Sequence, residues 1–195
     1  MLSNRFLVIA TTAVLLHVMD AVAQIPAELL GGGEVSQQAL DRESFYKGPE
    51  GQWLTVRHPD QVKGLHCGVV YVGKDAVFVI NGPLSPTLAA KNAGVVMFIS
   101  KNIPQPSGKS DMVPVTIFSS APPAKARVIH DAMGEFGVFS VPVKIAEMVK
   151  PSQNSESLGI EYEGKEVFRI NVEGYNAARA RLSKCMSAYV PPSKK

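Results

Sequence analysis

The sequence predicts a mainly β protein: an antiparallel β-sandwich-like domain with one short internal helix and one C-terminal helix. From Trp53 onward, short runs rich in Val, Ile, Phe and Tyr alternate with clusters of Gly, Pro, Asn, Asp and Ser. These runs recur at intervals of about ten to fifteen residues, which is typical of an antiparallel sandwich or barrel. The chain then ends in a segment with helical periodicity, so the helices are expected to be few and short.

The elements follow in chain order. Residues 24–50 contain a glycine triplet and few periodic apolar positions, which indicates a flexible lead-in with at most a short helix near residues 35–40. The expected strands are "QWLTVRH", "LHCGVVYVG", "DAVFVINGP", "GVVMFISKN", "VPVTIFSS", "AKARVIHDA" and "EFGVFSVP". The glycine-containing stretches 73–75 and 163–165 predict hairpin turns. "VKIAEMVK" predicts a helix of two turns, and "SLGIEYEGKEVFRINV" predicts a hairpin.

The last helix is predicted from Tyr175 to about Met186. At helical spacing, one of its faces carries Tyr175, Ala178, Leu182 and Cys185. The basic side chains Arg179, Arg181 and Lys184 are expected on other faces. The helix should therefore bury its apolar face against the sheet.

The first residues, 1–23, are typical of a signal peptide. Arg5 supplies the positive charge, residues 6–19 are predominantly apolar, and "AVA" precedes Gln24 at the expected cleavage point. A membrane-spanning helix needs roughly 20 apolar residues, and Asp20 ends this run too early. We therefore expect an exported protein, periplasmic or secreted, with no stable membrane insertion after cleavage. Residues 51–189 then form a single β-rich domain, and residues 190–195 form a disordered tail.

The two cysteines, Cys67 and Cys185, are expected to form a disulfide because exported chains fold in an oxidising compartment. A catalytic thiol would need a base, and His66 is adjacent. Neighbouring side chains on a strand point to opposite faces, which argues against that pair. No spacing typical of a metal site is present either. A further alternative is that the two cysteines are unpaired and serve only as small core residues.

Other motifs favour structural interpretations. Gly68–Asp75 nearly matches a phosphate-binding loop, but Asp75 replaces the required hydroxyl and the residues between favour a strand. His130 is expected to be a surface or half-buried residue. Trp53 is expected in the core, with a sugar-stacking platform as the alternative. The sequence thus indicates no catalytic residue, no metal site and no cofactor.

A long polar loop is the candidate partner-binding segment, since loops carry function more often than strands do. Its candidate residues are Asn102, Gln105, Ser107, Lys109 and Asp111. The formal net charge of +3 is small, and acidic and basic residues are interleaved along the chain. That distribution argues against a nucleic-acid partner.

The order of these pieces resembles the small exported alphaproteobacterial proteins of the invasion-associated locus B family. The likeness covers roughly residues 52–186 and rests on "QWLTVRHPDQVKGLHC", "VPVTIF", "VKIAEMVK…LGIEYEGKEVFRINV" and, most specifically, "GYNAARARLSKC". Such families often carry additional cysteine pairs, whereas this chain has two cysteines. The resemblance implies an all-β exported domain with a role at the envelope or in host contact and no known catalysis.

Together these features predict a non-enzymatic exported binding protein whose partner is a protein or an envelope glycan. One alternative is an inhibitor of a secreted or periplasmic enzyme, acting through the loop at residues 102–111. Another is an uncharacterised hydrolase, for which the sequence offers no recognisable set of catalytic residues.

Overall fold

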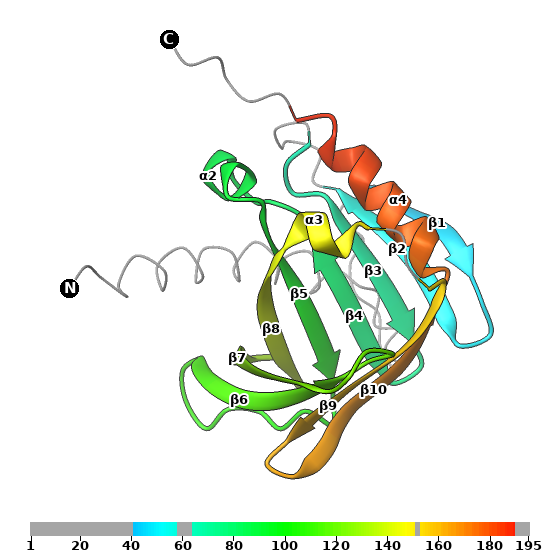
Figure 1. The fold of residues 1–195 in the computed structure, drawn as a ribbon. Helices are drawn as coiled ribbons and strands as arrows, with labels where there is room; N and C mark the ends of the chain where they lie inside the picture. The colour runs from blue at the N-terminus through cyan, green and yellow to red at the C-terminus, as the bar shows by residue number, and fades with distance from the viewer. Residues whose placement is uncertain (1–40, 58–63, 151–152, 190–195) are drawn as a thin grey trace.

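The described part of the chain forms one antiparallel sheet of ten strands with short helices around it (Figure 1). The computed structural model describes residues 41–57, 64–150 and 153–189. The strands are β1 (Asp41–Lys47), β2 (Gly51–Arg57), β3 (Gly68–Gly73), β4 (Ala76–Asn81), β5 (Ala93–Ser100), β6 (Asp111–Phe118), β7 (Ala124–Met133), β8 (Phe136–Lys144), β9 (Ser155–Tyr162) and β10 (Lys165–Glu173). The helices are α2 (Pro86–Ala90), α3 (Ile145–Met148) and α4 (Tyr175–Met186).

The strand order is β1-β2-β3-β4-β5-β8-β7-β6-β9-β10. The first five strands form a meander in which each strand pairs with the next. After β5 the chain skips two places in the sheet and forms β6. It then returns through β7 to β8, which fills the place next to β5 and pairs with it. The hairpin of β9 and β10 adds to the outer side of β6.

The sheet curls into a half-barrel, so its last strand packs across its middle. β10 contacts β3, β4 and β5, although it lies at the opposite end of the strand order from β1 (Figure 1). The indole N–H of Trp53 on β2 donates to the carbonyl oxygen of Glu173 at the end of β10, at 2.7 Å. This bond ties the first and last parts of the curled sheet together.

The central strands bury both faces, which explains their almost continuous apolar sequences. One face of β3–β5 presents side chains such as Tyr71, Phe78 and Phe98 to the concave core. The intervening residues, including Val70, Val79 and Met97, form a second buried apolar cluster on the opposite face. Because side chains alternate along a strand, each central strand contributes to both clusters.

Helix α4 closes one end of the curled sheet. Gly174 precedes it with φ of 71°, a conformation that glycine adopts without strain, and the Tyr46 ring occupies the space where a side chain would project. The backbone N–H of Tyr175 donates to the carbonyl oxygen of Asn154 at 3.0 Å. Tyr175, Ala178 and Leu182 are buried, as the helical periodicity predicts.

The fold confirms a mainly β, antiparallel domain but corrects the sandwich prediction. One continuous sheet curls over itself, and the sequence pattern of alternating strands does not distinguish this arrangement from two packed sheets. The hairpin of β9 and β10 and the helix α4 form where the sequence predicts them. The predicted two-turn internal helix is a single short turn, α3.

Two elements differ from the sequence-based expectation. Residues 41–47, assigned to the flexible lead-in, form β1 because their backbone groups pair with the edge of β2. Helix α2 was not predicted; it begins at Pro86 and is capped by the Ser85 hydroxyl, which accepts from the Leu88 N–H at 3.2 Å. The predicted signal peptide, the rest of the lead-in and the tail at 190–195 lie outside the described residues.

Candidate functional site

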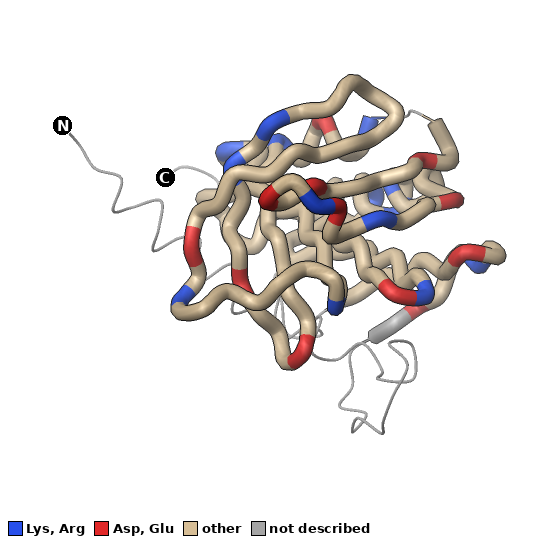
Figure 2. The backbone as a smooth tube through the Cα atoms, turned by 90° about the horizontal axis from the view of Figure 1, so that it is seen from below, with Lys and Arg blue, Asp and Glu red and all other residues tan. Residues whose placement is uncertain are grey.

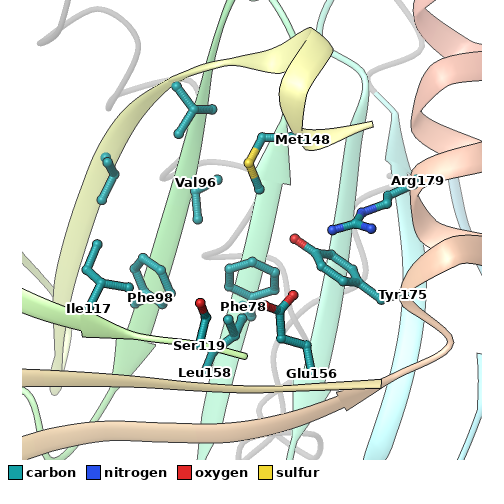
Figure 3. Close-up of a pocket in the computed structure, with 12 residues that line it drawn as sticks. Phe78, Val96, Phe98, Ile117, Ser119, Met148, Glu156, Leu158, Tyr175 and Arg179 are labelled. Carbon is teal, nitrogen blue, oxygen red and sulfur yellow. The ribbon is translucent and has the colours of Figure 1, made fainter. Parts of the chain in front are cut away.

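A cavity of about 300 Å³ opens into the concave side of the curled sheet (Figure 3). Its size falls at the lower end of the range of small-molecule sites, about 300 to 1,000 Å³. Strands from the middle of the sheet, β4, β5 and β8, and from one side of it, β6 and β9, contribute to the cavity. The cavity is therefore a product of the sheet's curvature rather than of any single sequence motif.

The inner wall of the cavity is apolar. Phe78 projects from β4, Val96 and Phe98 project from β5, and Leu158 faces them from β9. All four are buried. They occupy the concave-facing positions of their strands, so the alternation that builds the core also lines the cavity.

The half-buried lining residues mark the side where the cavity meets solvent. These are Ile117, Ser119, Val141, Val143, Met148 and Glu156. Met148 comes from the short helix α3, which the chain forms between β8 and β9. The mouth is thus mixed, with aliphatic side chains beside one hydroxyl and one carboxylate.

Helix α4 supplies the remaining wall through Tyr175 and Arg179. The Tyr175 ring stacks on Trp53, with ring centroids 6.0 Å apart and planes 8° apart. The guanidinium carbon of Arg179 lies 3.9 Å from the centroid of the Tyr175 ring. Burial raises the pKa of the Tyr175 phenol, and the charge of Arg179 opposes that rise only in part. Tyr175 is therefore neutral at physiological pH.

The position of Arg179 corrects the sequence analysis, which placed it away from the buried face. Arg179 is 8 % exposed and lines the cavity. It lies four residues after Tyr175, and residues at that spacing share a helix face. This spacing indicates that Arg179 shares the buried face of α4, although a basic residue is rarely buried.

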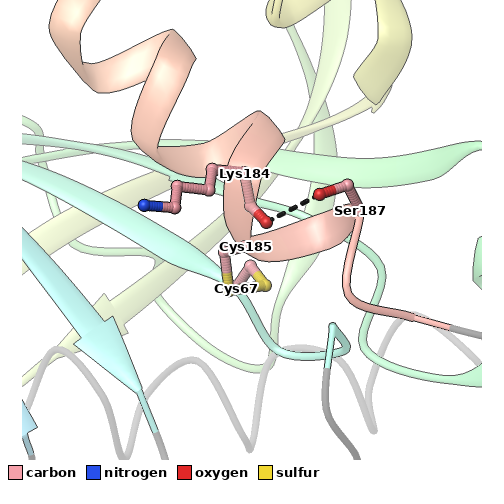
Figure 4. Close-up of a disulfide and its surroundings, with 4 residues drawn as sticks. All are labelled: Cys67, Lys184, Cys185 and Ser187. Atoms are coloured by element: carbon pink, nitrogen blue, oxygen red, sulfur yellow. Dashed lines mark hydrogen bonds between the residues drawn. A yellow bond between two sulfur atoms is a disulfide. The ribbon is translucent and has the colours of Figure 1, made fainter.

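The disulfide between Cys67 and Cys185 is confirmed (Figure 4). It joins the residue before β3 to the last turn of α4, with Cα atoms 5.9 Å apart and a sequence separation of 118. The sequence argument assumed that His66 lies on a strand, but it does not. Its φ is 56°, and its N–H donates to the carbonyl oxygen of Pro83. A paired Cys67 excludes the thiol nucleophile, and the bond fits an oxidising environment.

The five candidate residues of the loop are all exposed, and hydrogen bonds anchor its first part. The Asn102 N–H donates to the Ser100 hydroxyl at 3.1 Å, and the Gln105 side chain donates to the carbonyl oxygen of Gly134 at 2.8 Å. Ser107 and Lys109 are exposed, and Asp111 is the first residue of β6. The loop does not contribute to the cavity.

His130 is buried, not half-buried or exposed as predicted. Its ring Nε2 lies 2.6 Å from the carbonyl oxygen of Pro104, and the rings of Phe139 and Tyr162 flank it. The hydrogen bond explains why this polar ring can occupy the core. Trp53 is fully buried, which confirms the core interpretation and excludes an exposed sugar platform.

Charges of both signs are distributed over the described part of the molecule. Lys and Arg are interspersed with Asp and Glu over the view in Figure 2. Across residues 41–57, 64–150 and 153–189, no cluster of His, Cys, Asp or Glu is arranged to hold a metal ion. Within the same ranges, no helix has the length and apolar character needed to cross a bilayer.

Comparisons with protein-family models, curated proteins and solved structures find no match to this chain.

Proposed function

We propose that this protein is a non-enzymatic exported binding protein whose concave cavity holds a small, largely apolar ligand. The observation that carries the proposal is the cavity itself, which is open to solvent on one side and has buried aromatic and aliphatic side chains on its inner wall. Apolar cavities with a few polar groups at defined points are the usual form of small-molecule sites. A role at the cell envelope or in host contact agrees with the predicted signal peptide and the resemblance.

The geometry supports binding better than catalysis. The polar residues of the cavity, Ser119, Glu156, Tyr175 and Arg179, include neither a histidine nor a thiol. The buried His130 is bonded to a backbone carbonyl and packed between rings, so it is not placed to transfer a proton to a ligand in the cavity.

The experiment is a binding titration with an environment-sensitive apolar dye, 1-anilinonaphthalene-8-sulfonate, followed by displacement with decanoate and decanol. Val143→Trp should fill the cavity from its half-buried mouth and abolish binding. Val113→Trp is the matched control, since Val113 is also half-buried on a strand but does not line the cavity. We expect saturable binding to the wild type and to Val113→Trp.

Two results would contradict the proposal. One is that neither amphiphile displaces the dye from the folded wild-type protein. The other is that Val143→Trp binds as well as Val113→Trp does, which would place the bound dye elsewhere on the molecule.

A further inference from the structure

We infer that the ligand of the cavity is an amphipathic monoanion, an aliphatic carboxylate, whose acidic group binds Arg179. This inference rests on the proposed function and assigns the chemical class of its ligand. The observation behind it is a buried cation with unpaired donors beside an apolar cavity.

The guanidinium of Arg179 is buried without the hydrogen bonds it can make. Its Nε and Nη1 atoms are shielded from solvent and have no hydrogen-bond partner in the described part of the chain. Figure 3 shows the side chain extending from α4 toward Tyr175 at the edge of the cavity. A buried donor without a partner costs about 1 to 3 kcal/mol, and more when it is charged.

The contact with Tyr175 compensates for only part of this cost. A cation near an aromatic ring is attracted by the ring's electrons, by about 2 kcal/mol or more when desolvated. The Tyr175 hydroxyl also interacts with Arg179, but the Nε and Nη1 atoms have no hydrogen-bond partner in the described part of the chain. A ligand oxygen would satisfy donors that the protein leaves unpaired.

Arg181, unlike Arg179, is paired with a carboxylate. Arg181 lies two residues later on the same helix, and both of its terminal nitrogens bond the Glu43 carboxylate, at 3.1 and 3.4 Å. None of the ion pairs among the described residues includes Arg179. The unpaired arginine is the one that lines the cavity.

The acidic group in the cavity, Glu156, forms no ion pair with Arg179. Glu156 is half-buried at the mouth, where one carboxylate oxygen accepts from the Ser120 hydroxyl at 3.1 Å. Solvent screens a charge at such a position more than it screens the buried guanidinium. The inner part of the site therefore favours an anion.

A carboxylate with an aliphatic chain fits these features together. Its oxygens can accept charge-assisted hydrogen bonds from the unpaired N–H groups of Arg179, and such bonds are roughly twice as strong as neutral ones. Its chain would lie against Phe78, Val96 and Phe98, where burial of apolar surface contributes about 25 cal/mol per Å². A neutral alcohol of the same length gains the burial of its apolar chain but not the charge-assisted hydrogen bonds to Arg179.

The test compares decanoate with decanol by calorimetry, below the micelle-forming concentration of each. We expect decanoate to bind the wild type about tenfold or more tightly than decanol, because charge-assisted hydrogen bonds contribute about 1.5 to 3 kcal/mol. Arg179→Gln should remove this preference while keeping decanol binding. Arg181→Gln is the matched control and should keep the preference.

A second measurement on the wild type needs no variant at Arg179. Decanoate should shift the Nε–Hε NMR resonance of Arg179 and leave that of Arg181 in place, while decanol should shift neither. Equal affinity for the two amphiphiles, or an unshifted Arg179 resonance with decanoate bound, overturns the inference and leaves the proposed function standing. If neither decanoate nor decanol binds, both the inference and the proposed function are overturned.

Discussion

Removal of the disulfide should destabilise the protein mainly through its unfolded state. The bond between Cys67 and Cys185 closes a loop of 118 residues. In the chain-entropy model, a loop of that length restricts the unfolded chain by about 5 kcal/mol, and measured values are typically about 2 to 4 kcal/mol. The folded state should persist in the variants, because α4 remains held by its buried residues Tyr175, Ala178 and Leu182.

The assay is urea denaturation of Cys67→Ala, Cys185→Ala and the double variant, followed by the fluorescence of Trp53, the chain's one tryptophan. Trp53 stacks on Tyr175, so its emission reports directly on the docking of α4. All three variants should lose a similar free energy of unfolding, since each breaks the same bond. Backbone amides of α4 should exchange earlier with solvent, because a helix of about twelve residues is marginal when undocked.

Several results would refute this reasoning. Thiol labelling that finds both cysteines free in the native protein purified without reductant would remove the bond altogether. Single losses that add up to the loss in the double variant would show two independent packing effects instead of one shared bond. A loss below about 1 kcal/mol would show that loop length does not set the effect.

Three further predictions concern other parts of the chain. Trp53→Ala should cost about 3 to 5 kcal/mol in urea denaturation followed by circular dichroism, because a fully buried ring and its bond to Glu173 are lost; a near-wild-type midpoint would contradict this. Ala23→Phe should block processing of the exported protein, which N-terminal sequencing would detect; an exported wild type that begins at Met1 would refute the signal peptide. Burial raises the pKa of Tyr71 to about 12, so its contribution to stability should be complete below pH 10 and be lost as the pH rises toward 12; tyrosinate absorbance with all tyrosines titrating near 10 would contradict this.

Local patterns in the sequence predict the local elements of the fold. Alternation places Val69 and Tyr71 on the same face of β3, and the glycine at 164 predicts the turn between β9 and β10. Helical spacing places Tyr175, Ala178 and Leu182 on the buried face of α4. Each of these inferences depends on residues within a few positions of one another, which is the range over which periodicity carries information.

The sequence does not predict features that depend on distant pairing. The return of β8 to β5, with β6 and β7 beyond it, follows from contacts between residues far apart in the chain. The curl that creates the cavity has the same origin, so neither the cavity nor the burial of Arg179 was foreseen. His130 was misplaced for a related reason, since its partner, the carbonyl of Pro104, comes from another segment.

The closure of the sheet by its last residues has a consequence for how the chain folds as it is synthesised. Trp53, near the start of the domain, reaches its hydrogen-bond acceptor and its stacking partner only when residues 173–175 are present. The concave side of β3–β5 is likewise uncovered until β9 and β10 have left the ribosome. The concave core therefore stays incomplete for most of the synthesis of the domain, as expected for a topology dominated by non-local contacts. A chain that lacks only β10 and α4 should leave an apolar face of the preceding strands exposed, and that face favours aggregation.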